Sequence, residues 1–147
     1  MDSPRVAELE RRLGYRFHDP GLLEQALTHA SYANEHPPAA DHSRLAFLGD
    51  AALALVVTDR LVTDDPAATV GALTSQRAEL VTGTRLARWA TDLELGALLR
   101  LGRGEDQSGG RTRESILAST LEAVLGAIYA EGGIDALRDT VGRLAAW

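Results

Sequence analysis

The stretch SRLAFLGDAALALVV, residues 43–57, decides the fold of this chain. Apolar side chains fall on nearly every side of it when it is wound at 3.6 residues per turn, so no clear polar face remains. A helix of that kind is typical of the centre of a domain. Its one carboxylate is Asp50, and we expect this side chain to be buried with the rest of the helix.

A second apolar segment, residues 116–129, carries Glu122 as its only charge. An ionised carboxylate without a partner in an apolar setting is costly, so it protonates, pairs with a cation or binds a metal ion. We therefore expect Asp50 and Glu122 to lie together, or each with a partner. Two interpretations stay open from the residues alone: the acids are structural hydrogen-bond anchors, or they are ligands.

Composition predicts one all-α domain over residues 1–147. The chain is 45% hydrophobic and 24% charged, which is ordinary for a soluble globular protein. Aromatic residues make up only 5%, so Ala, Leu and Val must fill the core, and these residues favour close helix packing. No stretch resembles a signal peptide or a membrane span, and there is no cysteine. We expect a cytoplasmic protein without membrane association or disulfides.

The net charge of -6 argues against strong nucleic-acid binding by the overall surface, because affinity for phosphate comes mainly from clustered cations. Every one of the 15 basic residues is an arginine, and four are grouped at Arg100, Arg103, Arg111 and Arg113. This group is either a local anion-facing patch or a solvated loop with scattered arginines. Both interpretations remain open.

Helix signals divide the chain into short segments. Ser3, Asp19 and Thr69 are N-cap residues at the starts of apolar patterns, and glycine or proline follows the ends. Proline-rich residues 34–41 and glycine-rich residues 102–111 predict loops, and Gly132 with Gly133 predicts a break. We expect helices over residues 4–13, 20–28, 43–61, 70–81, 85–93, 116–129 and 134–147, with no strand, repeat or linker.

Three ordered segments carry a family resemblance: ALTHASYANE (26–35), RLAFLGDAAL (44–53) and LRLGRGEDQSGGRTRESILASTLEAVLGAIY (99–129). Their order and spacing resemble the endonuclease domain of bacterial ribonuclease III over nearly the whole chain. The family signature NERLEFLGDA aligns with residues 42–51, and its second acidic segment, ILADTLEA, aligns with residues 116–123.

The resemblance implies an all-helical fold and a homodimer in which two sites cut double-stranded RNA, using Mg²⁺ held by carboxylates. It also implies that Phe47 inserts into the partner subunit, although an ordinary core position would also explain this residue. The family's usual C-terminal double-stranded-RNA-binding domain has no counterpart before Trp147. We therefore expect poor RNA affinity if the chain naturally ends there.

Three of the family's five acidic positions have lost their carboxylates. Ser43, Ala46 and Ser119 occupy them, and only Asp50 and Glu122 remain. Nearby acids at Asp41, Glu35 and Glu114 are not convincing replacements, since two lie in or near a predicted loop and the third on another helix face. With fewer oxygen ligands we expect weak Mg²⁺ binding and slow or absent strand scission.

Three functions follow as hypotheses. The first is a catalytically impaired homodimer that acts as a binding or regulatory module. The alternative is an active or weak Mg²⁺-dependent double-stranded-RNA endoribonuclease. A second alternative is a fold reused for small-molecule chemistry, with His29, Tyr32, Asp50 or Glu122 as acid or base. For His29 the favoured interpretation is structural, as a residue that positions a helix.

Overall fold

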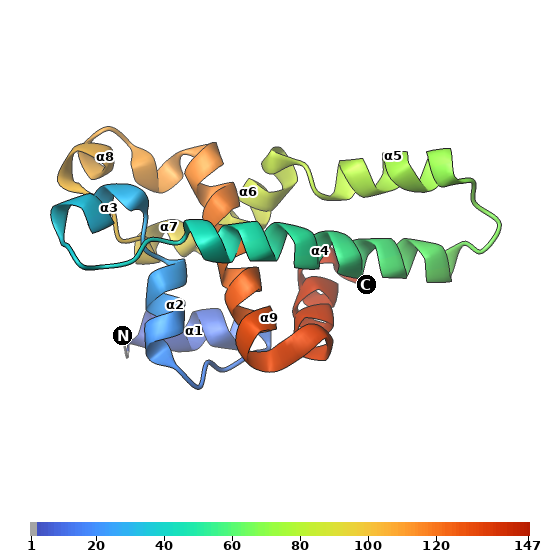
Figure 1. The fold of residues 1–147 in the computed structure, drawn as a ribbon, viewed down its shortest axis with the longest axis horizontal. Coiled ribbons are helices and arrows are strands. Elements are labelled where there is room, and N and C mark those ends of the chain that lie inside the picture. The colour runs from blue at the N-terminus through green and yellow to red at the C-terminus, as the bar shows by residue number, and fades with distance from the viewer. Residues whose placement is uncertain (1–2) are drawn as a thin grey trace.

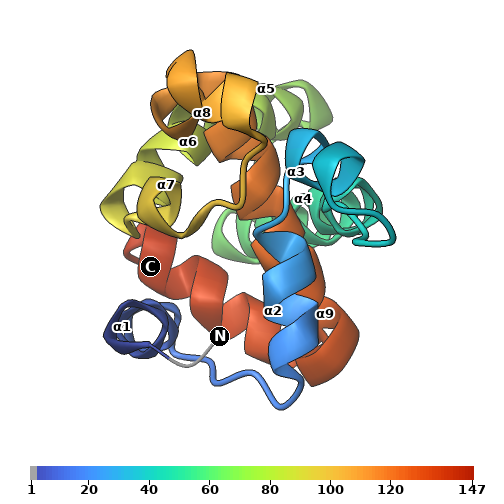
Figure 2. The same cartoon turned by 90° about the vertical axis from the view of Figure 1, so that its left-hand side faces the viewer.

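The computed structural model describes residues 3–147 as a packed set of helices (Figures 1 and 2). Among these residues the only β pairing is an isolated bridge between Thr28 and Arg100, so the all-α prediction is confirmed. No helix in this part of the chain is long and apolar enough to span a bilayer. The elements are α1 (Pro4–Leu13), α2 (Pro20–Ala26), α3 (Ala30–Glu35), α4 (Ser43–Asp64), α5 (Val70–Leu80), α6 (Gly83–Asp92), α7 (Leu95–Leu98), α8 (Arg103–Gln107), the 3₁₀ turn η1 (Gly110–Thr112) and α9 (Glu114–Ala145).

Two long helices, α4 and α9, cross at the centre of the molecule (Figure 1). Helix α6 covers another side of α9, while α1 and α2 lie around its C-terminal half (Figure 2). The core that they enclose is almost entirely aliphatic, as the low aromatic content predicts. Its fully buried side chains include Leu53, Leu121, Leu125, Ile128 and Leu137.

Helix α4 is not buried all round, contrary to the prediction. Leu45, Gly49 and Leu53 face the core, but Phe47 is 85% exposed and Leu55 is 57% exposed. The helix has only α9 and its neighbours on one side, so its second apolar face meets solvent. Beyond the crossing, α4 and α5 form an arm that projects from the body (Figure 1).

Helix α9 changes direction at the predicted break. Gly133 has φ 85° and ψ -177°, which is outside the helical region and is readily adopted only by glycine. Close to this kink, the Glu131 carboxylate accepts hydrogen bonds from Tyr15 Oη (2.7 Å) and from the backbone N–H groups of His18 (2.7 Å) and Asp19 (2.9 Å). Glu131 thereby fastens the α1–α2 connection to α9.

Two predicted loops are partly helical. The sequence predicted that the second helix would end near residue 28 and that a loop would begin at residue 34. Instead α2 ends at Ala26, and a separate helix, α3, occupies residues 30–35. Helix α8 and η1 lie inside the predicted loop over residues 102–111. Both short helices are fixed by side-chain contacts: His29 accepts a hydrogen bond from Ser31 N in α3, and the Glu35 carboxylate accepts from Arg103 N at the start of α8.

Candidate active site

The two lone acids meet where α4 crosses α9. Gly49 and Gly126 are the contact points: a Cβ atom at Gly49 would lie 1.7 Å from Glu122 O, and one at Gly126 would lie 2.1 Å from Leu45 O. The helix backbones therefore touch, which no larger residue at these positions would permit. Because Asp50 follows Gly49 directly and Glu122 lies one turn before Gly126, the crossing brings the two carboxyl groups together.

Asp50 lies close enough to Glu122 to shift its pKa, so the two acids lie together, which is one of the two arrangements that the sequence predicted. Burial, then interaction with the Asp50 side chain, raises the pKa of Glu122 to about 8. Glu122 is therefore mostly protonated at neutral pH. The prediction that both acids are buried is wrong for Asp50, which is exposed, whereas Glu122 is half-buried. Asp50 is exposed beside the crossing, whereas its buried neighbour Gly49 takes the contact face.

The three positions without carboxylates supply no charged oxygen. Ser43 is exposed, and its N–H (2.8 Å) and hydroxyl (2.6 Å) both donate to Asp41 Oδ1. Ala46 and Ser119 are half-buried. Within residues 3–147, no cluster of three or more His, Asp or Glu side chains is placed to hold a metal ion.

The other nearby acids are each engaged in structural contacts. Asp41 caps the first turn of α4, and its hydrogen bonds from Ser43 hold the pKa of its carboxyl below the ordinary value. Both carboxylate oxygens of Glu35 accept from Arg103 N at 3.0 Å. Glu114 accepts from Thr84 Oγ1 at 2.9 Å. These contacts leave Asp50 and Glu122 as the acidic pair at the crossing.

The structure places His29 and Tyr32 at α3, where their side-chain contacts are with Ser31, His42, His36 and Arg100 rather than with the acid pair. His29 Nδ1 accepts from Ser31 N at 3.1 Å and contacts Ser31 Oγ at 2.8 Å, so His29 is the N-cap of α3. Tyr32 packs under the Arg100 guanidinium, whose Cζ lies 4.2 Å from the ring centroid.

Sequence reasoning assigned nothing to His42, which is buried beside this region. Its ring centroid lies 5.8 Å from that of His29, and Nδ1 lies 3.5 Å from Thr120 Oγ1 on α9. Burial, followed by the charge of His29, lowers the pKa of His42, so its ring favours the neutral form. A lone histidine in a polar stretch carries no pattern that predicts burial.

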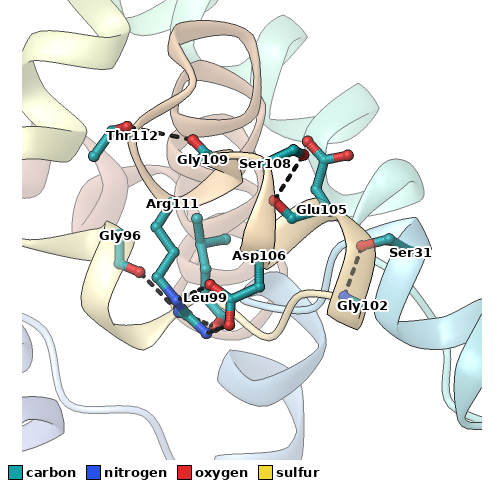
Figure 3. Close-up of polar contacts among 10 residues, drawn as sticks. All are labelled: Ser31, Gly96, Leu99, Gly102, Glu105, Asp106, Ser108, Gly109, Arg111 and Thr112. Atoms are coloured by element: carbon teal, nitrogen blue, oxygen red, sulfur yellow. Dashed lines mark hydrogen bonds and ion pairs between the residues drawn. The ribbon is translucent and has the colours of Figure 1, made fainter.

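The glycine-rich segment beside α3 is an ordered cap rather than an open loop (Figure 3). Arg111 Nη1 donates to the carbonyls of Gly96 (3.0 Å) and Leu99 (2.7 Å), and Arg111 Nε donates to Asp106 (2.8 Å). Gly102 N donates to Ser31 Oγ at 2.8 Å and so joins α8 to α3.

The four grouped arginines do not form a patch of free cations. Arg100 pairs with Glu24, Arg111 with Asp106 and Arg113 with Glu105. Arg103 is exposed, and its guanidinium takes part in no ion pair within the described chain. Of the four arginines in the predicted anion-facing patch, Arg103 is therefore the one without an ion-pair partner within residues 3–147.

Comparison with known proteins defines the class of this fold. A family model described as Ribonuclease-III-like matches residues 19–146. The nuclease domain of ribonuclease III from Campylobacter jejuni superposes with a TM-score of 0.88 at 37% identity, covering 97% of this chain and 94% of that one. Another structure of that nuclease domain shows structural flexibility in the region involved in dimer formation. Dicer from Pichia stipitis gives a TM-score of 0.65 at 28% identity, covering 89% of this chain and 55% of that one.

Curated relatives agree with the structural match. Ribonuclease 3 of Alkalilimnicola ehrlichii is 49% identical over 144 residues, covering 98% of this chain and 60% of the relative. Ribonuclease 3 of Streptomyces coelicolor is 50% identical over 136 residues, covering 92% and 49%. The chain thus spans about half to three fifths of the length of these relatives. The fold is the all-α ribonuclease III nuclease-domain fold, and the chain belongs to the ribonuclease III family, as the resemblance predicted.

The residues at the crossing fit a divalent cation only as a minimal donor set. Mg²⁺ in phosphoryl-transfer sites is commonly bound through one or two carboxylates, with water and substrate phosphates completing the octahedron. Asp50 and Glu122 meet that minimum. Glu122 must first release its proton, because a protonated carboxyl is a poor ligand and its pKa of about 8 keeps the proton in place at neutral pH.

Proposed function

We propose that this chain acts on double-stranded RNA as a ribonuclease III-type endoribonuclease whose cleavage is slow because its centre holds Mg²⁺ weakly. The observation that carries the proposal is the Asp50–Glu122 pair, positioned by backbone contact at Gly49 and Gly126. Similarity of about 50% to relatives named Ribonuclease 3 supports a nuclease over a module reused for small-molecule chemistry.

Asp50 and Glu122 would hold the cation, and the bound ion would lower the pKa of an attacking water and offset charge on the leaving oxygen. Serine and alanine at positions 43, 46 and 119 contribute no negative charge to that task. Cleavage should therefore require higher cation concentrations, and it should rise with pH as Glu122 loses its proton.

The proposal includes a homodimer formed through the outer face of α4. Phe47, Ala51 and Leu55 recur at intervals of four residues, so they share one exposed face. Asp50 borders this stripe, one turn from Phe47. Contact with a second chain would cover the stripe and bring the carboxylate pair to the edge of the interface.

A second candidate function is a binding or regulatory module without cleavage. It is favoured by one observation, the lack of any cluster of three potential metal-ligating side chains within residues 3–147. The same experiment separates the two functions.

The test incubates long double-stranded RNA with excess protein and Mg²⁺ or Mn²⁺. We expect slow, cation-dependent cleavage by the unmodified chain and none by Asp50→Asn. The double variant Ala46→Glu with Ser119→Asp should cleave faster by roughly 100-fold or more, because two carboxylates return to the centre. RNA left intact by the unmodified chain but cut by the double variant would support the binding module instead. Intact RNA with both would contradict the nuclease proposal.

A further inference from the structure

An ordered aromatic cluster lies on α3, outside the carboxylate pair. Tyr32 and His36 are one turn apart, and their rings are nearly parallel, with centroids 4.0 Å apart and 12° between the planes. His36 is exposed. Since one face of its imidazole lies against Tyr32, the surface that it presents to solvent is the other face and the ring edge.

Contacts of Tyr32 with Arg100, on α3's neighbouring segment, hold this cluster in place. The Arg100 guanidinium lies 4.2 Å from the Tyr32 ring centroid, and Arg100 is itself paired with Glu24. The Arg100 backbone is fixed as well, because its N–H donates to Leu27 O (2.8 Å) and its carbonyl accepts from His29 N (3.0 Å). The His36 imidazole Nδ1 lies 3.1 Å from Tyr32 O. The rings are therefore arranged before any ligand arrives, which lowers the entropic cost of binding.

The start of α8, which carries Arg103, lies next to the end of α3. The Glu35 carboxylate accepts from Arg103 N at 3.0 Å, which places the first residue of α8 beside the end of α3. Arg111 and Arg113 are engaged by Asp106 and Glu105, whereas Arg103 enters no ion pair in residues 3–147. A flat exposed aromatic surface matches the face of a nucleobase, and an exposed arginine on the neighbouring helix adds positive charge for its phosphate.

We propose that His36, stacked on Tyr32, binds an unpaired nucleobase of single-stranded RNA flanking a duplex, with Arg103 contacting the adjoining phosphate. This inference rests on the proposed action on double-stranded RNA. It adds that the chain recognises an unpaired base next to the duplex. Bases inside a duplex are covered by their neighbours, so only an unpaired base offers a face to His36. The cluster thus favours duplexes with a single-stranded overhang over blunt ones.

The test measures the affinity of the full chain for a blunt RNA duplex and for the same duplex with a short single-stranded overhang, by fluorescence anisotropy without divalent ions. The overhang duplex should bind more tightly. His36→Ala should weaken overhang binding by about 5- to 100-fold and leave blunt-duplex binding unchanged. His36→Phe retains a flat ring and should retain the preference. His18→Ala removes another exposed histidine and serves as the matched control.

The outcomes separate this inference from the proposed function. Equal affinity for the two duplexes, or no loss with His36→Ala, would overturn the stacking site while duplex binding stands. Failure of the unmodified chain to bind either RNA would overturn both proposals. Saturable binding of adenosine monophosphate that His36→Ala abolishes, without an overhang preference, would assign the cluster to a free nucleotide and overturn the RNA assignment.

Discussion

At the scale of single residues, the proposed binding of a cation depends on the protonation of Glu122. Its carboxyl is half-buried between two apolar helices beside Asp50, so a bound proton removes the charge that a cation would otherwise offset. A cation bound as proposed would compete with the proton at this side chain. The raised pKa of Glu122 also makes the stability of the fold depend on pH.

Replacing Glu122 by glutamine should stabilise the protein at high pH only. The folded-state pKa of about 8 exceeds the ordinary value of 4.5, so the folded chain binds more protons than the unfolded chain between those values. The stability that Glu122 contributes is thus complete below about pH 4.5 and is lost as pH rises through 8. Glutamine does not ionise, so Glu122→Gln should exceed the parent by about 1–2 kcal/mol at pH 9 and match it at pH 5.

Urea denaturation at the two pH values measures this difference. Glu79→Gln, at an exposed position on α5, is the control and should change stability little at either pH. An equal effect of Glu122→Gln at pH 5 and pH 9 would show that ionisation of Glu122 is not coupled to folding.

At the scale of elements, the crossing of α4 and α9 depends on Gly49. An alanine Cβ would lie 1.7 Å from Glu122 O, so the helices must separate. Gly49→Ala should cost about 3 kcal/mol or more in the free energy of unfolding, since backbone cannot move aside as a flexible side chain can. Chemical denaturation gives this value. Gly142→Ala, in α9 with no atom within 4 Å of the added Cβ, should instead be neutral or stabilise by up to about 1 kcal/mol. Equal behaviour of the two variants would contradict the close crossing.

The longer helices were predictable because their signals are local. Ser3, Asp19 and Thr69 cap α1, α2 and α5 through their own side chains, as the sequence indicates. Helix α8 was missed because its cap comes from Glu35, 68 residues earlier in the chain. No local pattern encodes such a contact.

The candidate site was predicted in part for the same reason. Lone acids in two apolar segments indicated that Asp50 and Glu122 would lie together or each with a partner, and they lie together. The exposure of Asp50 and of Phe47 was not predictable from periodicity, because α4 is apolar on both faces and its partner α9 decides which face is covered.

At the scale of the whole molecule, the exposed apolar face of α4 predicts a dimer. A phenylalanine that is 85% exposed beside Leu55 is unusual for a monomeric surface. Light scattering should give a mass of about twice 15.7 kDa for the parent and a monomer mass for Phe47→Asp, because a buried charge at the interface is costly. Trp147→Ala removes a different exposed aromatic residue and should remain dimeric. A monomeric parent would contradict the homodimer.

The link between the N-terminal segment and α9 should weaken in acid. Burial raises the pKa of Glu131, but hydrogen bonds from His18, Tyr15 and Asp19 outweigh burial and lower it to about 2. Its stabilising effect is therefore present above pH 4.5 and disappears as pH falls towards 2. Glu131→Gln should lose about 2 kcal/mol at pH 7 and converge with the parent near pH 2, as followed by thermal denaturation. A constant difference across this range would exclude the ionised carboxylate as the cause.

The affinity of the unmodified chain for Mn²⁺, measured by electron paramagnetic resonance, tests the central claim that two carboxylates hold the cation weakly. We predict weak binding at one site per chain that strengthens as pH rises towards 8, disappears in Asp50→Asn and tightens by about tenfold or more in Ala46→Glu with Ser119→Asp. Tight, pH-independent binding that survives Asp50→Asn would contradict it.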